Sequence, residues 1–192
     1  MRKTTIGVIG SSGEAPGSDG AAIMQVAHAI GVQVATVGAV LVSGGTTGVM
    51  AAASQGAHEA GGTTVGFLPD ADYARASEHV DIAFPTGMGT IRNLLTARCC
   101  DAVIMVNGGV GTLNELTIAY DFGTPVIVVE GTGGWADRIR PVLIEDTWLD
   151  ERRAVAITFA ATAQDAVADA VRRAVEPRRG TSLPVYAGPA GR

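Results

Sequence analysis

Residues 102–115 read AVIMVNGGVGTLNE: a short apolar run, a glycine-rich turn and the beginning of a helix-length segment. An apolar run without polar alternation is typical of a strand that is covered on both faces, as in a parallel sheet. The glycines of Asn107–Glu115 either let a phosphate approach the backbone, with Glu115 behind it as a catalytic carboxylate, or only form a tight turn that starts a helix. This stretch alone leaves both interpretations open.

The same order of strand, turn and helix repeats along the chain. Apolar runs predict strands at Thr5–Gly10, Ala39–Ser43, Thr63–Phe67, Ile82–Phe84, Ala102–Val106, Val126–Val129 and Val155–Thr158. Helix-length segments lie between most of them, at Gly20–Ala35, Gly48–Ala60, Thr90–Cys99, Thr112–Phe122, Trp135–Ile144 and Ala163–Val175. This alternation predicts an α/β fold, namely a Rossmann-like, doubly wound, mostly parallel sheet of about seven strands flanked by helices. We expect a single nucleotide-binding domain over residues 1–176 and a flexible C-terminal tail over residues 177–192.

The composition excludes several classes of protein. The formal net charge is −5, so the chain has no uniform basic field with which to bind nucleic acid. It contains no apolar run long enough to span a membrane and no signal-peptide pattern, and the adjacent Cys99 and Cys100 cannot form a loop-closing disulfide. We therefore expect a cytoplasmic protein with no nucleic-acid or membrane partner. We also expect no metal site, because His28, His58 and His79 share no ligand spacing with the cysteines.

The lysine content is a further restriction. Lys3 is the only lysine, and it lies at the beginning of the first predicted strand, away from the edge where loops gather. Pyridoxal-phosphate chemistry needs a lysine within the site, so this class of enzyme is not expected. A Walker-A phosphate loop is excluded because no Gly-Lys-Ser/Thr sequence occurs. The dinucleotide fingerprint G-x-G-x-x-G is also missing from the glycine turns, which argues against an NAD enzyme.

Four turns of small residues follow predicted strands: Gly10–Gly13, Ser43–Gly48, Pro85–Gly89 and Asn107–Thr112. The carboxyl ends of parallel strands meet at one edge of the sheet, where ligands bind in this fold. Each turn opens a helix whose first N–H groups are free, and these groups stabilise an anion by about 0.3–2 kcal/mol per helix end. A single turn of this kind can serve merely to connect a strand to a helix, but four of them at one edge of the sheet favour an anionic, nucleotide-like ligand. The residues predicted to bind it are Gly10, Ser11, Ser12, Gly44, Gly45, Thr46, Gly87, Gly89, Asn93, Gly108, Gly109, Gly111 and Thr112.

Glu115 has two interpretations. Thr112 and Glu115 have the spacing of a capping box, which would stabilise the helix by about 1 kcal/mol. Alternatively, the carboxylate stabilises a cationic, sugar-like transition state or orients a water molecule. Arg92 lies on the first turn of the preceding helix and so belongs near the same edge, whereas Arg98 lies about 9 Å further along it. We therefore expect Arg92, rather than Arg98, to belong to the site.

The stretch NGGVGTLNE resembles the PGGxGTxxE signature of the LOG (Lonely Guy) family, whose members are often labelled lysine decarboxylases. The resemblance covers about Ile6 to Val129. It places the signature glutamate on Glu115 and the arginine that precedes it on Arg92. It places the phosphate loop on Gly108, Gly109, Gly111 and Thr112, and a second glycine loop on Gly44, Gly45 and Gly48. The family implies a Rossmann-like fold, a homodimer or homotetramer, and hydrolysis of nucleoside 5′-monophosphates, such as cytokinin ribotides or AMP, to free base and ribose 5-phosphate without a cofactor.

At three places the sequence departs from the LOG pattern, and there it is more similar to a sister branch of the same superfamily. Asn107 replaces the signature proline, Asn93 replaces the lysine after the arginine, and the stretches IGVIGSSG and TGMGTIRN look closer to the molybdenum cofactor carrier proteins. Members of that branch bind a phosphorylated pterin without transforming it. The sequence therefore predicts either a phosphoribohydrolase with Glu115 and Arg92 as catalytic residues, or a carrier of molybdenum cofactor (molybdopterin) or another phosphorylated ligand. A nucleotide sensor that uses the same cleft is a third possibility.

Overall fold

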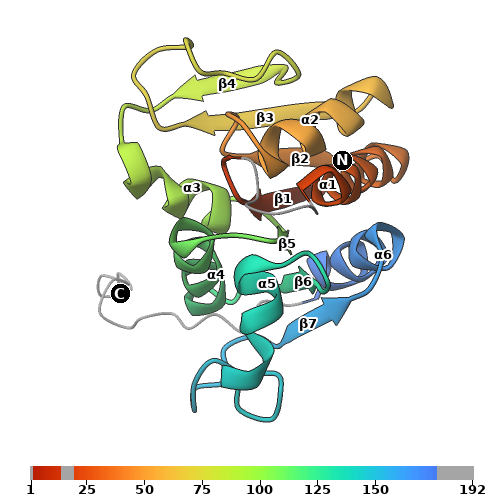
Figure 1. Cartoon of the computed structure of the whole chain (residues 1–192), viewed down its shortest axis with the longest axis vertical. Coiled ribbons are helices and arrows are strands. Elements are labelled where there is room, and N and C mark those ends of the chain that lie inside the picture. The colour runs from red at the N-terminus through yellow and green to blue at the C-terminus, as the bar shows by residue number, and fades with distance from the viewer. Residues whose placement is uncertain (1, 14–19, 177–192) are drawn as a thin grey trace, which may run out of the picture.

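The computed structural model describes residues 2–13 and 20–176, so the predicted tail at residues 177–192 lies outside the described residues. Seven parallel strands form one sheet in the order β4-β3-β2-β1-β5-β6-β7 (Figure 1). Their bounds are β1 Thr5–Gly10, β2 Val40–Ser43, β3 Thr63–Leu68, β4 Ile82–Pro85, β5 Ala102–Val106, β6 Val126–Val129 and β7 Ile157–Ala160. The predicted fold class, a Rossmann-like parallel sheet, is confirmed.

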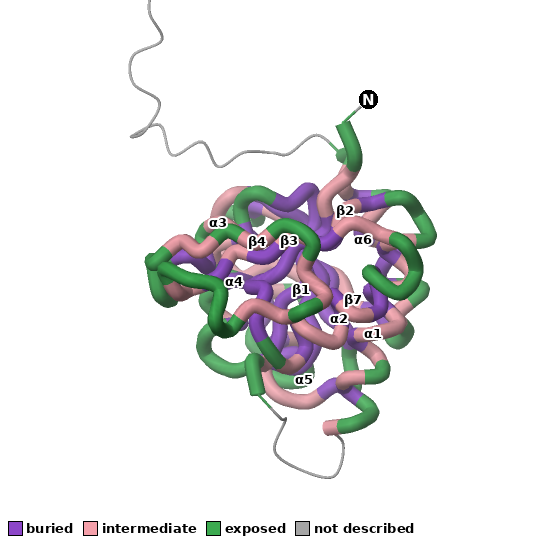
Figure 2. The backbone as a smooth tube through the Cα atoms, turned by 90° about the horizontal axis from the view of Figure 1, so that it is seen from above, coloured by how far each residue is buried: buried purple, intermediate pink, exposed green. Residues whose placement is uncertain are grey.

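Helices cover both faces of the sheet. One layer contains α1 (Gly20–Thr36), α2 (Val49–Glu59) and α6 (Ala163–Ala174), which share one apolar core with the sheet. The other contains η1 (Gly89–Arg92), α3 (Asn93–Arg98), α4 (Val110–Asp121), α5 (Gly134–Arg138) and η2 (Arg140–Val142), and its core lies on the opposite face. The central strands are buried between these layers, and exposed segments lie at the periphery (Figure 2). Strands β5 and β6 are fully buried, which explains their continuous apolar sequence.

Small residues set how closely the first layer packs. A Cβ atom added at Gly31 of α1 would lie 2.0 Å from the carbonyl oxygen of Ala53 in α2, and one at Gly56 would lie 2.0 Å from that of His28. The backbones of α1 and α2 therefore touch directly. This contact explains why glycine and alanine carry the packing in a chain with few aromatic residues.

Two predicted helices are shorter than expected, and one strand is displaced. The segment Thr90–Cys99 divides into η1 and α3, and Trp135–Ile144 divides into α5 and η2, where Pro141 lacks the N–H group that a continuous helix needs. The last strand begins at Ile157 rather than Val155. The chain still turns at Arg153, whose φ is 50°, and only Ile157 comes into register with Val126 of β6.

Two carboxylates hold strands at the amino edge of the sheet. Asp101 Oδ2 accepts hydrogen bonds from the backbone N–H of Thr5 at 2.9 Å and from its hydroxyl at 3.1 Å. Asp81 Oδ2 accepts the corresponding bonds from Thr64 at 2.8 and 3.0 Å. Lys3 lies at this edge as well, at the beginning of β1. At the edge of the sheet opposite the glycine turns, the two carboxylates therefore fix the register of the strands.

Candidate functional site

The order of the strands reverses between β1 and β5. The chain passes from β1 outwards to β4, returns to β5 beside β1, and then continues to β7. Gly10 at the end of β1 is in register with Val106 at the end of β5, so the loops that follow these two strands begin side by side. In open α/β sheets the ligand crevice lies at such a reversal, outside the carboxyl ends of the strands.

The helix after β5 has an open, uncapped beginning. Helix α4 starts at Val110, and its N-cap residue is Gly109, which has no side chain to accept a hydrogen bond from the N–H groups of the first turn. A Cβ atom added at Gly109 or Gly111 would meet no atom within 4 Å, and both glycines are exposed. The first N–H groups of α4 therefore face open space, as an anion-binding helix end requires.

Asn107 explains why the signature proline is missing. Its φ is 56°, which proline cannot adopt, and its backbone N–H donates to Thr132 Oγ1 at 2.8 Å. Its side-chain Nδ2 donates to the Thr132 carbonyl at 2.6 Å, while its Oδ1 accepts from the N–H of Gly108. Asn107 thus ties the α4 loop to the loop after β6.

The loop after β6 is a part of the site that the sequence analysis missed. A Cβ atom at Gly134 would lie 2.5 Å from the carbonyl oxygen of Gly108, and Trp135 N–H donates to that oxygen at 2.9 Å. The available signal was the stretch GTGG at residues 131–134, a fifth glycine turn at the same edge of the sheet. These residues fix the position of the α4 loop.

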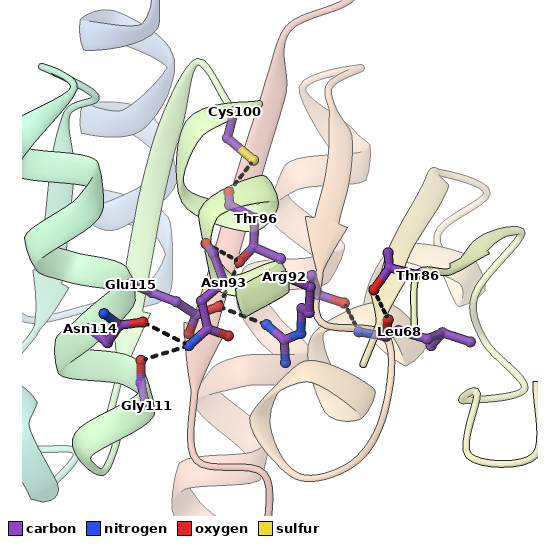
Figure 3. Close-up of polar contacts among 11 residues, drawn as sticks. Leu68, Thr86, Arg92, Asn93, Thr96, Cys100, Gly111, Asn114 and Glu115 are labelled. Carbon is purple, nitrogen blue, oxygen red and sulfur yellow. Dashed lines mark hydrogen bonds and ion pairs between the residues drawn. The ribbon is translucent and has the colours of Figure 1, made fainter. Parts of the chain in front are cut away.

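Arg92 and Glu115 lie together, as expected, but they are buried (Figure 3). Arg92 Nη1 donates to Glu115 Oε1 at 3.0 Å, and Thr96 Oγ1 donates to the same oxygen at 2.6 Å. The exposed fractions are 9% for Arg92 and 5% for Glu115. Burial raises the pKa of Glu115, and the charge of Arg92 and the Thr96 hydroxyl counter this only in part. Because α4 begins before Thr112 and Glu115 contacts α3, the capping-box interpretation is wrong.

Arg92 also closes the space above the second glycine loop. A Cβ atom at Gly44 would lie 2.5 Å from Arg92 Nη2, so this position admits only glycine while the arginine stays in place. Arg92 Nε is buried and has no hydrogen-bond partner among the described residues. The guanidinium therefore links the second glycine loop to Glu115, and its buried Nε stays without an acceptor among the described residues.

Asn93 and Arg98 have different roles in the packing of α3. Asn93 is buried, and its Nδ2 donates to Asn114 Oδ1 at 3.1 Å and to the Gly111 carbonyl at 3.5 Å. It therefore holds α3 against the first turn of α4. Arg98 lies over the ring of Phe122, at the other end of α4, with 5.2 Å from its guanidinium carbon to the ring centroid. This agrees with the expectation that Arg98 lies away from the site.

The first two glycine loops pack against each other. The backbone N–H of Val49 donates to the Ser11 carbonyl at 3.0 Å, and the Thr47 hydroxyl donates to the Ser12 carbonyl. A Cβ atom at Gly48 would lie 2.3 Å from the Ser11 carbonyl oxygen. The hydroxyl of Ser11 is itself buried without a hydrogen-bond partner in the described part of the chain. The structure thus brings these loops to the crevice between β1 and β5.

The remaining predicted residues lie further out. Gly87 and Gly89 follow the edge strand β4, three strands from β1, with φ of 64° and 54°. They are not beside the α4 end, and they form the turn into η1, which carries Arg92. Thr46 is buried and lines a cavity beside α2.

Over residues 2–13 and 20–176, no group of three or more His, Cys, Asp or Glu side chains could hold a metal ion, and no helix is long and apolar enough to cross a membrane.

Comparisons with known proteins agree with this architecture. The family model described as the SLOG cluster4 family matches residues 3–167. The crystal structure of TM1055 superimposes with a TM-score of 0.83 at 38% identity, covering 88% of this chain and 99% of that one. The molybdenum cofactor binding protein of Rippkaea orientalis has a TM-score of 0.75 at 31% identity, covering 92% and 99% of the two chains. The molybdenum cofactor carrier protein of Chlamydomonas reinhardtii has a TM-score of 0.71 at 31% identity, covering 91% and 100%.

Proposed function

We propose that this chain, which belongs to the SLOG cluster4 family, binds and carries a phosphorylated small molecule without transforming it. The phosphate of the ligand binds at the open beginning of α4, over Gly109 and Gly111. One observation carries the proposal. The helix end is open to a ligand, whereas the carboxyl group of Glu115 is bonded to Arg92 and Thr96 and closed off from solvent. Such a site can bind an anion, but the carboxyl group of Glu115 is not exposed to act as an acid or base beside it.

The unpaired polar groups near the crevice support a ligand there. The hydroxyl of Ser11 and Nε of Arg92 are buried without hydrogen-bond partners among the described residues. Buried donors in native proteins are almost always paired, so each of them calls for an acceptor that the described residues do not provide. Phosphate oxygens are strong acceptors of this kind.

Molybdenum cofactor is the ligand that we favour. Two proteins of similar fold, with 31% identity to this chain, are a molybdenum cofactor binding protein and a molybdenum cofactor carrier protein. The cofactor is cargo in this function, so the chain needs a phosphate-binding loop and a place for the ring system, but no catalytic group. The exposed Gly109 and Gly111, where an added Cβ atom would meet no atom within 4 Å, provide close backbone approach for such a ligand.

Hydrolysis of nucleoside monophosphates is the second candidate, and one observation favours it. Arg92 and Glu115, the pair that the LOG resemblance implies, lie 3.0 Å apart. In this function Glu115 must turn from Thr96 towards the sugar, and the phosphate again binds at α4. The reaction releases free base and ribose 5-phosphate, and it requires no cofactor.

One experiment separates the two functions. The purified protein is incubated with a panel of nucleoside monophosphates, and free base is measured by chromatography. In parallel, the protein is purified from cells that make molybdenum cofactor, and the bound material is oxidised and examined for pterin fluorescence. We expect bound pterin and no free base. Release of base that disappears in Glu115→Gln, without bound pterin, would establish the hydrolase instead.

We also propose that the chain is a homodimer or homotetramer. Ile91 and Leu94, on η1 and α3, have exposed fractions of 68% and 38%. Exposed apolar side chains next to each other often mark an interface. Light scattering of the eluting protein measures the subunit number directly, and a monomer at micromolar concentration would contradict the proposal.

A further inference from the structure

A cavity of about 720 Å³ opens between α1, α2 and the loop that follows β3. This volume lies within the range of about 300–1,000 Å³ that small-molecule sites occupy. Neither Gly109 nor Glu115 lines the cavity, so it is distinct from the open end of α4. No motif in the sequence pointed to it, although one predicted ligand-binding residue, Thr46, lies in its wall.

One part of the cavity wall is apolar and consists mostly of small side chains. Ala51 and Ala52 of α2 line one side, Ala74 and Ala76 of the loop line another, and Met24 of α1 also contributes. Because alanine side chains are short, the surfaces of α2 and of the loop that face the cavity are nearly flat at these positions. A flat ring can lie against such surfaces and bury both of its faces.

The polar residues of the cavity offer both donors and acceptors. Gln55 Nε2 donates to Glu59 Oε1 at 2.8 Å, which leaves the amide oxygen of Gln55 as an acceptor. The Thr47 hydroxyl donates to the Ser12 carbonyl, which leaves its lone pairs available. Ser77 and Thr46 add two further hydroxyl groups. Groups of both kinds suit the nitrogen and oxygen atoms at the edge of a heterocycle.

The charges around the cavity do not suit a phosphate. The guanidinium of Arg75 already binds Asp70, with Nε at 2.8 Å from Oδ2 and Nη2 at 2.6 Å from Oδ1. Glu78, a second fully charged residue among the described residues that line the cavity, would repel an anion. A planar guanidinium held in place by a carboxylate can still stack on a flat ring. The cavity therefore favours an uncharged heterocycle over an anionic group.

The second glycine loop connects the cavity with the crevice. Its residues Gly44 and Gly45 lie beneath Arg92 and beside β3, and the next two residues, Thr46 and Thr47, line the cavity. The backbone N–H of Ser77 donates to the Gly45 carbonyl at 2.9 Å, so the loop after β3 is fixed to the same turn. Strand β2, which leads into this turn, lies two strands from β5, or about 10 Å at the usual strand spacing.

We propose that this cavity binds the flat nitrogen heterocycle of the ligand whose phosphate binds at α4. The inference rests on the proposed phosphate site, and it assigns the ring to the wall formed by Gln55, Ala74 and Thr46. Purines and pterins share this ring chemistry. One ligand then spans the edge of the sheet from α4 to α2, with its phosphate and its ring in separate subsites.

The test compares four variants with three probes. The probes are AMP, a phosphorylated pterin and inorganic phosphate, and their dissociation constants are measured by calorimetry. Ala74→Trp fills the cavity from its exposed rim, and Gln55→Ala removes the amide without adding bulk. Gly111→Asp places a carboxylate at the phosphate site. Ala168→Trp, at an exposed position of α6 far from the cavity lining, is the matched control for added bulk.

We expect Ala74→Trp to raise the dissociation constant of the ring-bearing probes by about tenfold or more. Gln55→Ala should raise it by a smaller factor, and Ala168→Trp should leave it unchanged. Inorganic phosphate should bind to all three as to the unchanged protein, because it does not enter the cavity. Of AMP and the phosphorylated pterin, the probe that binds more tightly to the unchanged protein identifies the ring as a purine or a pterin. Unchanged binding of both ring-bearing probes to Ala74→Trp and Gln55→Ala, with weaker binding to Gly111→Asp, would overturn the inference but leave the phosphate site intact. Unchanged binding of every probe to Gly111→Asp would instead overturn the proposed phosphate site.

Discussion

Arg92 Nη1 donates to Glu115 Oε1 at 3.0 Å, and the two residues join η1 to α4 inside the protein rather than at its surface. Thr96 donates to the same carboxylate oxygen at 2.6 Å. The arrangement fixes α4 relative to η1 and α3, and so fixes the direction in which the first N–H groups of α4 point. The pair therefore positions the helix end at which we propose that the phosphate binds.

Replacement of one partner of this pair should destabilise the protein strongly. Glu115→Leu leaves Arg92 buried without its carboxyl partner, which costs about 3–5 kcal/mol. The double variant Arg92→Met/Glu115→Leu should recover most of this loss, because apolar groups of similar size replace both charges. Urea unfolding of the three proteins measures the effect. Equal stability of Glu115→Leu and the unchanged protein would show that Arg92 and Glu115 do not form a buried pair in solution.

The stability of the protein should also depend on pH through Glu115. Burial raises its pKa in the folded state, so the folded protein holds this proton more tightly than the unfolded chain. The stabilisation from the protonated form is complete below the unfolded value of about 4.3 and is lost as the pH rises through the folded pKa. The difference in unfolding free energy between the unchanged protein and Glu115→Gln should therefore fall as the pH rises above about 4. A difference that grows with pH would mean that the pair instead lowers this pKa.

Much of the fold could be predicted because its signal is local. The apolar run Ala102–Val106 and the glycine turn after it identify a buried strand and a helix beginning within a few residues. Parallel strands then bring the glycine turns to one edge, and the rise along a helix separates Arg92 from Arg98. None of these steps requires knowledge of which elements pack against one another.

The environment of Glu115 could not be predicted, because it depends on contacts between distant segments. Its place near the beginning of a helix is visible in the sequence, but the neighbours that it faces are set by the packing of η1 and α3, which carry Arg92 and Thr96. The cavity was missed for the same reason. Ala74 and Ala76 become a ligand wall only when the loop after β3 lies beside α2. Asn107 was noticed as a departure from a family pattern, yet its positive φ has no signature in the sequence.

Asn107→Pro should damage the α4 loop even though it restores the family's signature residue. Proline cannot reach a φ of 56° and cannot donate to Thr132, so the variant loses the bonds to that residue and forces the turn to change. We expect a loss of about 2–4 kcal/mol in stability together with weaker binding of inorganic phosphate. Asn107→Gly is the control, since it keeps the backbone conformation and N–H and loses only the side-chain bonds. A stable Asn107→Pro that binds phosphate normally would contradict the described loop.

The two glycines Gly108 and Gly111 should respond in opposite ways to replacement by alanine. A Cβ atom at Gly111 meets open space within a helix, so Gly111→Ala should raise the unfolding free energy by up to about 1 kcal/mol in the absence of ligand. The same methyl group lies where we propose that the phosphate binds, so phosphate affinity should fall. Gly108 has a φ of 109°, and its Cβ atom would lie 2.6 Å from Thr112 Cβ, so Gly108→Ala should lose about 1–3 kcal/mol. Thermal unfolding with and without phosphate measures both effects. A gain in stability for Gly111→Ala without any loss of phosphate binding would mean that the glycine serves only the turn, and that the anion binds elsewhere along the edge.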